Sequence, residues 1–364
     1  MRDGSGLAGA PTQLLPDPHG GPLAYSPLVP RIVGIDTARG LAVLGMMTAH
    51  VGPDDAWRAT PPGGWAQLAD GRPAALFVVL AGFSLALLSG GTAPVAGAAA
   101  LASRVRILAR AAILLVLGYL LVALGTPIAV ILPTYAVLFA IALVPLRWSR
   151  GALLVAAGVV ALVGPLLRHW YQGLGTEPLG ELGDLLFGHY YPAAVWLAYV
   201  LAGLALGRTD LSRARTRWVL AACGLAAVLV GHVGAWLLRT QLAAPAWWAT
   251  TEPHSSTTLE LIANTGVATL VIVGAVALGE RFPRALAPIS AVGALALTAY
   301  TVHIVAIAII GPEVVYEPAI GSWLVFLGVT LVACWAWRAW LGRGPLERLM
   351  HGLSTRAARA IHAG

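Results

Sequence analysis

Continuous apolar segments of about twenty residues recur along almost the whole sequence. A hydrocarbon core about 30 Å thick is crossed by roughly twenty residues of α-helix, and lipid offers no partners to exposed backbone groups. Charged residues make up 11% of the chain, against about 25% in soluble domains, which is too few to cover a water-facing surface. The sequence therefore predicts an all-α integral membrane protein. A porin-like barrel would instead show alternating segments of about ten residues.

Ten apolar ranges are predicted to be transmembrane helices. They are 32–51, 73–90, 107–125, 128–146, 151–168, 190–207, 217–238, 260–279, 288–310 and 321–341. Together they define a polytopic membrane domain over 31–341. Residues 1–30 are rich in Pro and Gly and lack the apolar centre of a signal peptide, so they are predicted to be a flexible cytoplasmic tail. Residues 342–364 are predicted to be a cytoplasmic tail able to form an amphipathic helix on the membrane surface.

The distribution of basic residues predicts the orientation. All 23 are arginines, and most fall in loops and tails on one side of the ten ranges. By the positive-inside rule, both termini face the cytoplasm. Three outer loops, near 52–72, 169–189 and 239–259, are long and contain Trp, His, Asp and Glu, which favours a site that opens outward. We expect a multi-pass protein of a bacterial plasma membrane whose first partner is the lipid bilayer, with no nucleic-acid partner.

The first predicted helix carries three ionisable side chains, Asp36, Arg39 and His50, close to one face. Bare charges at mid-bilayer cost several kcal/mol, so such groups normally face a bundle interior or a hydrated cavity. Asp36 and Arg39 are three residues apart and can form an ion pair. Two interpretations remain open: the pair fixes the first helix against its neighbours, or the whole face lines a passage that binds substrate.

His303 is a second candidate base, because a histidine is the side chain best suited to accept a proton near neutral pH. A continuous ninth helix over 288–310 would place it in the same outer half as His50. Tyr300, Thr301 and Asn264 are candidate hydrogen-bonding groups there. A lone histidine bonded to a neighbouring helix is the structural alternative. His232 has no polar companions at helical spacing, and three further histidines are expected to be solvated in outer loops: His169, His189 and His254.

Two further groups of charges are candidates for binding substrates. Asp70 and Arg72, in "DGRP", can position an anionic or sugar substrate, unless they are only exposed charges at a helix entry. Arg39 and three loop arginines can bind the phosphates of CoA, although the positive-inside rule already explains the loop residues; these are Arg104, Arg106 and Arg110. No Cys or His spacing fits a zinc motif, so no metal is expected.

Four motifs resemble known membrane proteins. "RIVGIDTARGLAVLGMMTAHV" resembles the first helix of the YeiB-like proteins and of the heparan-α-glucosaminide N-acetyltransferase family, with its Arg and Asp-x-x-Arg-Gly. "GRPAALFVVLAGFSLAL" is similar to the second helix of that group. "ALTAYTVH" and "GRGPLERL" are similar to a late helix and a C-terminal motif of YeiB-like proteins. The resemblance thus covers about residues 31–350.

The resemblance implies a transmembrane acyltransferase bundle of ten or eleven helices. In that family, acetyl-CoA from the cytoplasm acetylates a sugar amine across the membrane, and a histidine of the first outer loop serves the reaction. Here that loop contains no histidine after His50, which makes His50 the nearest substitute. The leading hypothesis is transfer of an acyl group, with acetyl the expected one, from cytoplasmic acyl-CoA to an extracytoplasmic glycan or glycolipid. Alternatives are a transporter or lipid-handling protein and a purely structural protein; a homodimer is a further expectation.

Overall fold

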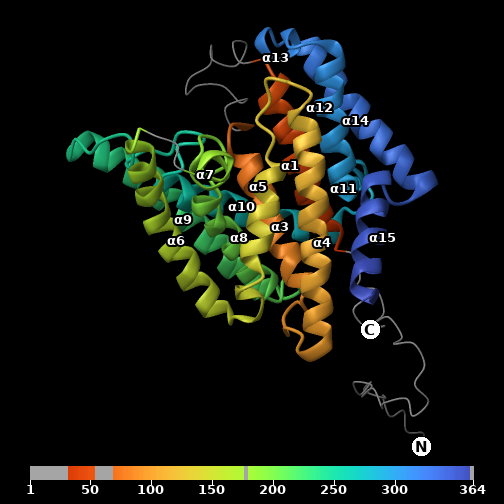
Figure 1. The fold of residues 1–364 in the computed structure, drawn as a ribbon, viewed down its shortest axis with the longest axis horizontal. Coiled ribbons are helices and arrows are strands. Elements are labelled where there is room, and N and C mark those ends of the chain that lie inside the picture. Colours follow the sequence, from red (N-terminus) through yellow and green to blue (C-terminus); the bar gives the residue numbers. More distant parts are fainter. Residues whose placement is uncertain (1–31, 54–68, 176–178, 361–364) are drawn as a thin grey trace, which may run out of the picture. The chain divides into compact units, whose positions relative to one another are not determined.

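The computed structural model describes residues 32–53, 69–175 and 179–360, and within these ranges the chain is helical and contains no β-strand. The all-α prediction is thereby confirmed. The helices, shown in Figure 1, are α1 (Val33–Val51), α3 (Arg72–Leu88), α4 (Gly97–Val122), α5 (Leu132–Ala142), η2 (Pro145–Arg147), α6 (Arg150–Gly173), α7 (Gly180–Phe187), α8 (Ala193–Gly207), α9 (Ala214–Gln241), α10 (Thr258–Arg281), α11 (Ala287–Ala294), α12 (Ala296–Ile310), α13 (Glu313–Tyr316), α14 (Ile320–Leu341) and α15 (Pro345–Ala360).

Length and composition make this a multi-pass membrane protein. Five described helices are long and apolar enough to cross a bilayer, namely α4, α6, α9, α10 and α14, and the bent pair α11–α12 counts as a sixth. Each of the other predicted ranges also falls on a helix, but α3, α5 and α8 have 17, 11 and 15 residues. At 1.5 Å per residue, α5 and α8 are shorter than a hydrocarbon core of about 30 Å.

The short and the long helices differ in what surrounds them. Nearly all of α8 is buried, and it packs against α3, α6 and α5. In contrast, α9 and α14 expose large apolar side chains such as Trp218 and Trp335, as helices that face lipid do. Because the core helices are short, a central region of the bundle is bounded by loops, and the cavity described below lies against such loops.

Two boundaries differ from the sequence predictions. The ninth predicted helix is not continuous: α11 and α12 meet at Leu295 with a bend of 82°. The third predicted helix, 107–125, begins earlier than expected, because α4 starts at Gly97. The range in which an amphipathic C-terminal helix was expected contains α15, and α15 packs against α4.

The backbones of α1 and α11 are in direct contact. A Cβ on Gly293 would overlap the carbonyl oxygen of Asp36, and one on Gly40 would overlap the carbonyl oxygen of Ile289. Small residues permit this close approach, which is a common way for membrane helices to associate. The contact fixes α11 against the half of α1 that carries Asp36.

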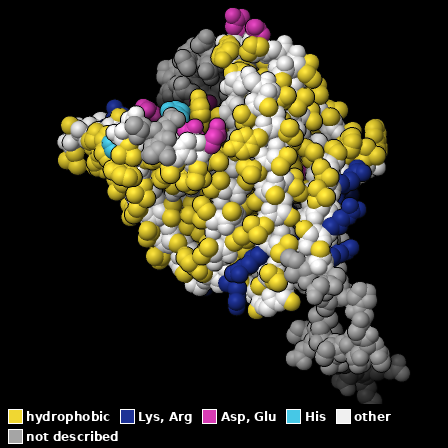
Figure 2. All heavy atoms as spheres, viewed as in Figure 1, with side chains coloured by type: hydrophobic (Ala, Val, Ile, Leu, Met, Phe, Trp, Pro, Cys, Tyr) yellow, Lys and Arg dark blue, Asp and Glu magenta, His cyan; other side chains and the backbone are white. Residues whose placement is uncertain are grey.

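Charge is distributed unevenly over the face drawn in Figure 2. Arginine side chains gather along the right edge, where Figure 1 shows α15, and at the lower edge, whereas acidic side chains lie in the upper half, at the top near α13 and near α7. Apolar side chains cover most of the surface between them. The predicted orientation, with the arginine-rich end in the cytoplasm, remains a prediction.

Candidate functional site

The two predicted candidate bases meet in the structure. Nδ1 of His50, at the end of α1, lies 3.0 Å from Nε2 of His303 in the middle of α12. The rings are stacked, with centroids 5.3 Å apart and planes inclined by 20°. His303 is buried behind His50. Since one nitrogen of His50 is engaged by His303, its Nε2 is the ring nitrogen that a ligand can reach.

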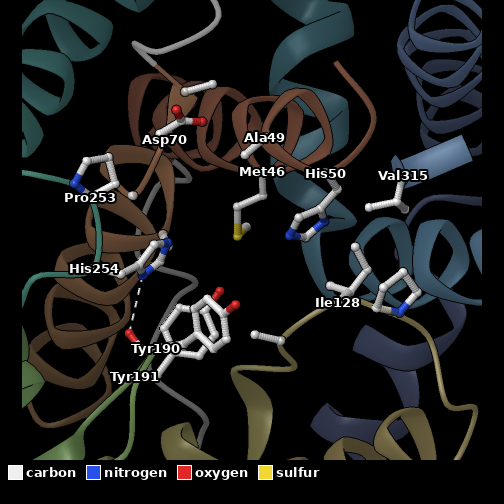
Figure 3. Close-up of a pocket in the computed structure, with 15 residues that line it drawn as sticks. Met46, Ala49, His50, Asp70, Ile128, Tyr190, Tyr191, Pro253, His254 and Val315 are labelled. Carbon is white, nitrogen blue, oxygen red and sulfur yellow. Dashed lines mark hydrogen bonds between the residues drawn. The ribbon is translucent and has the colours of Figure 1, made fainter. Parts of the chain in front are cut away.

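His50 lines a cavity of about 280 Å³ at the end of the bundle where α1 terminates (Figure 3). The wall is built from five further segments of the chain, and its residues are Met46, Ala49, His50, Ala69, Asp70, Gly71, Ala74, Pro127, Ile128, Ala129, Tyr190, Tyr191, Pro253, His254 and Val315. The cavity therefore combines an apolar wall with a few polar groups, which is typical of small-molecule sites.

His254 and two tyrosines face His50 across this cavity, and Figure 3 shows both phenol groups directed into the space. Nδ1 of His254 lies 3.3 Å from the carbonyl oxygen of Tyr190. Burial lowers the pKa of His254 below its usual value, and His189 lowers it further, although the Tyr190 carbonyl acts in the opposite direction. His254 is therefore neutral at pH 7. His254 was expected to be a solvated loop residue; it does lie in a loop, but it is partly buried and lines the cavity.

Two charged side chains hold the loop that carries His254. Glu260, in the first turn of α10, accepts hydrogen bonds from the backbone N–H groups of His254 at 2.9 Å and of Ser256 at 2.6 Å. Arg168, on α6, donates to the carbonyl oxygen of Ser255 at 2.9 Å. With two backbone groups bonded to buried Glu260 and a third to half-buried Arg168, this loop is fixed against the bundle.

Arg168 also connects the loop that carries His254 to the segment that carries Tyr190 and Tyr191. Its guanidinium donates to the carbonyl oxygens of Gly188 at 3.2 Å and His189 at 3.1 Å, directly before the two tyrosines. The sequence analysis identified neither Arg168 nor the tyrosines. Their contacts join segments about twenty to ninety residues apart, and no local pattern reveals such pairings.

Among the predicted substrate-binding residues, only Asp70 lines this cavity. Arg72 is the first residue of α3 and is not part of the lining. Tyr300 is buried beneath the histidine pair: its hydroxyl accepts a hydrogen bond from the Ile131 N–H at 3.3 Å, and its ring meets His303 edge-on at 5.3 Å. Tyr300 thus supports His303 and does not reach the cavity wall.

Asp36 and Arg39 lie elsewhere, in the first half of α1. Nη1 of Arg39 is 3.0 Å from Oδ1 of Asp36 and 3.4 Å from the carbonyl oxygen of Gly293, and Nη2 donates to Ser84 Oγ at 3.1 Å. Asp36 is buried. The lining of the cavity at His50 does not include either residue, so the predicted passage along the whole face of α1 is not formed by that cavity.

The remaining candidates make contacts within the protein. Asn264 donates to the Tyr199 hydroxyl and to Glu260, both at 3.3 Å, and His232 bonds the carbonyl of Val228 on its own helix. Thr301 Oγ1 is buried without a hydrogen-bond partner in the described chain. Within the described ranges, no group of three or more His, Cys, Asp or Glu side chains could hold a metal ion.

A family model with the description "Heparan-alpha-glucosaminide N-acetyltransferase, catalytic" matches residues 31–244. The chain belongs to this family. The resemblance found in the first helices is thereby confirmed. No curated protein sequence matches the chain.

The part matched by the heparan-alpha-glucosaminide N-acetyltransferase family runs from α1 into the loop after α9. It therefore contains His50, Asp70 and the two tyrosines of the cavity. His254 and His303 follow it in the sequence. The site thus combines one wall from the matched region with two histidines from the C-terminal third of the chain. The contact between His50 and His303 links the two parts of the sequence.

Proposed function

We propose that this protein is an integral membrane acyltransferase that moves an acetyl group from cytoplasmic acetyl-CoA to a glycan or glycolipid on the other side of the membrane. Membership in the N-acetyltransferase family supports the reaction class. The observation that carries the proposal is the His50–His303 pair at the wall of a cavity bordered by Asp70 and aromatic side chains.

In the proposed reaction, His50 is the general base. Its Nε2 takes a proton from the amine or hydroxyl of the acceptor, whose nitrogen or oxygen attacks the thioester carbonyl carbon. The new C–N or C–O bond forms as the C–S bond breaks. CoA leaves as a thiolate, and the proton held by His50 neutralises it. Proton transfer by a positioned histidine typically accelerates a reaction by about 10²- to 10⁴-fold.

His303 acts through His50. When Nδ1–H of His50 donates to Nε2 of His303, the lone pair of His50 Nε2 faces the cavity, as a base requires. When His50 becomes an imidazolium, the neighbouring imidazole shares the added charge, much as a carboxylate orients the histidine of a catalytic triad. His303 is thus a positioning residue in this proposal, supported in turn by the ring of Tyr300.

The opposite wall of the cavity is suited to the acceptor. Asp70, Tyr190, Tyr191 and His254 offer hydrogen-bond donors and acceptors beside aromatic faces, a combination that can bind the hydroxyl groups and ring of a sugar. Neutral His254 can accept a hydrogen bond at Nε2. The acyl-CoA would enter from the arginine-rich end.

The alternative function is transport, because discontinuous helices such as α11–α12 form the substrate sites of many transporters. In those proteins the ends of the half-helices bind the substrate. Here the amide groups at the start of α12 are bonded to Glu347, and a carbonyl near the end of α11 is bonded to Arg39. Side chains of the protein itself thus occupy these groups, which favours the enzyme.

The test uses purified protein in proteoliposomes with [¹⁴C]acetyl-CoA on one side and glucosamine on the other. The proposal predicts transfer of label to glucosamine by the wild type and by His232→Ala, and a fall of at least about 100-fold in His50→Ala. His232 is the matched control because it is a histidine within a membrane helix that bonds only its own backbone among the described residues. If acetyl-CoA is neither bound nor consumed by the wild type, the proposal is wrong.

A further inference from the structure

The break between α11 and α12 lies next to the proposed site. α12 begins at Ala296 and carries both Tyr300 and His303. A helix end leaves up to four backbone N–H groups or four C=O groups without partners, and lipid cannot satisfy them. Leu295, at the junction, has no side chain able to cap α12. Other parts of the protein must therefore stabilise the break.

Glu347, from the first turn of α15, caps the start of α12. Its Oε1 accepts hydrogen bonds from the backbone N–H of Leu297 at 2.9 Å and of Thr298 at 3.1 Å, and its Oε2 accepts one from the Thr298 hydroxyl at 2.6 Å. Thr298 Oγ1 in turn accepts a bond from the Leu346 N–H at 3.3 Å. A carboxylate at a helix N-terminus also interacts favourably with the helix dipole.

The residues around Glu347 are adapted to this contact. A Cβ on Gly344 would overlap Oε2 of Glu347 and would lie 2.8 Å from Thr298 Oγ1, so a side chain there would displace the cap. Arg348 donates to the carbonyl oxygens of Arg343 at 2.7 Å and Leu341 at 3.0 Å, which fixes the turn before α15. The motif "GRGPLERL" is thus a unit that brings one carboxylate to the start of α12.

The other side of the break has the complementary charge. Arg39 donates from Nη1 to the carbonyl oxygen of Gly293, in the last turn of α11. A cation at a helix C-terminus and an anion at a helix N-terminus are both favourable placements. Arg39 and Glu347 therefore stabilise the two helix ends from opposite directions, and the bend of 82° is held by side chains of α1 and α15.

We infer that Glu347 is a positioning residue for acyl transfer, because it fixes the start of the half-helix that holds His303 against His50. The inference rests on the proposed function. Thr298 precedes His303 by five residues, about 7.5 Å along a helix. A rotation or shift of α12 at its first turn is therefore transmitted to the 3.0 Å contact between the histidines. Displacements of about 1 Å can lower catalysis by about 100-fold.

The experiment compares Glu347→Ala with Glu347→Gln and Thr298→Val, in the full-length protein. Glu280→Ala is the matched control, because the Glu280 side chain is exposed and forms an ion pair with Arg217 at the end of α10. Three properties are measured: hydrogen exchange of the peptide that covers 295–305, the ¹⁵N shifts of labelled histidines, and the kinetics of acetyl transfer. Only the last needs an active enzyme.

In Glu347→Ala, we expect faster hydrogen exchange of the peptide 295–305 and altered ¹⁵N shifts of His50 and His303. We also expect kcat to fall about tenfold or more, with little change in KM for acetyl-CoA. Glu347→Gln keeps one acceptor oxygen. Its exchange rate, ¹⁵N shifts and kcat, and those of Thr298→Val, should lie between the values for Glu347→Ala and for the wild type. In a His303→Ala background, the effect of Glu347→Ala on kcat should disappear, since interacting residues are not additive.

Faster exchange without a change in the histidine shifts or in kcat would overturn the inference, because the cap would then be structural only. An equal loss of kcat with and without His303 would overturn it as well. If the wild type transfers no acetyl group while the shifts respond to Glu347→Ala, the positioning of His303 stands and the proposed function fails. If Glu347→Ala does not fold, the same criteria apply to Thr298→Val.

Discussion

The two ends of α1 carry ionisable side chains on nearly the same face, yet they have different surroundings. At its C-terminal end, His50 faces a cavity and contacts another imidazole. In its N-terminal half, Asp36 and Arg39 contact each other and Arg39 also bonds Ser84 and a carbonyl of α11. The difference lies in the neighbouring segments: α11 touches α1 through glycines, whereas the cavity at His50 is lined largely by loop residues.

The comparison teaches that a polar stripe on a membrane helix does not define one site. Both groups satisfy the rule that charges avoid lipid. One does so by forming bonds to the protein, and the other by lining a space for a ligand. The substrate-binding role predicted for Asp36 and Arg39 remains a prediction, and their contacts favour a structural role.

The largest expected effect is the loss of activity when His50, at the C-terminal end of α1, is replaced. His50→Ala should lower kcat by about 10²- to 10⁴-fold, since it removes the proposed base. His303→Ala should cause a smaller loss, and the double variant should be no slower than His50→Ala, because His303 acts through His50. Steady-state kinetics of label transfer, with Tm as a control for folding, measures this. Additive losses in the double variant would show two independent roles.

The second effect is a loss of stability when the ion pair in the N-terminal half of α1 is broken. Arg39→Met removes the partner of buried Asp36 and should lower the free energy of unfolding by about 3–5 kcal/mol. Thermal or denaturant unfolding in detergent measures the change. Arg213→Met is the control, because the Arg213–Asp210 pair is exposed and such pairs contribute little. Equal stability of the two variants would contradict the structural role of Arg39.

A smaller effect concerns the wall opposite His50. Tyr191→Phe and His254→Ala should each raise KM for the acceptor by about tenfold and leave kcat nearly unchanged, because each removes a hydrogen bond to a bound ligand. His169→Ala is the control, since His169 is exposed and stacks on Trp247 away from the cavity. A fall in kcat with no change in KM would place these residues in the chemical step.

The smallest effect is a pH dependence of stability. The folded-state pKa of His254 is lowered, so its contribution is fully present above the unfolded value of about 6.5 and is lost as pH falls below it. His254→Gln should therefore flatten the decrease of Tm between pH 7 and pH 5. The groups facing His254 are unchanged in the variant; they include Glu260, His50, Asp70 and Tyr190. Identical Tm profiles would show that His254 is not buried.

The sequence was sufficient for those features that depend on local pattern. Apolar length predicted the helices, and the spacing of Asp36, Arg39 and His50 placed them near one face. The sequence placed His50 and His303 in the same outer half, compatible with one site, although the continuous ninth helix used for this placement is bent at Leu295. In contrast, the break at Leu295 has no local mark beyond Gly293, since 288–310 contains no charged residue and its only proline is the first residue, Pro288.

Features that depend on pairing between distant segments could not be predicted. Glu347 looks like one charge of an amphipathic helix until its contact with Thr298 is seen. His254 looks like any loop histidine, and its loop is held at the cavity by bonds to Glu260 and Arg168. In each case the deciding contact joins a charged side chain to backbone groups, and such contacts leave no periodicity in the sequence.

The most direct test of the contrast within α1 is cysteine accessibility. Cys223 and Cys334 are first replaced by Ala, and single cysteines are then placed at Ala49, which lines the cavity, at buried Ala42, and at exposed Leu41 among apolar surroundings. A charged methanethiosulfonate reagent should modify Ala49→Cys rapidly, and glucosamine with acetyl-CoA should slow that reaction, whereas the other two should react slowly. Equal modification at Ala42 and Ala49, or slow modification at Ala49, would contradict a hydrated site confined to the His50 end.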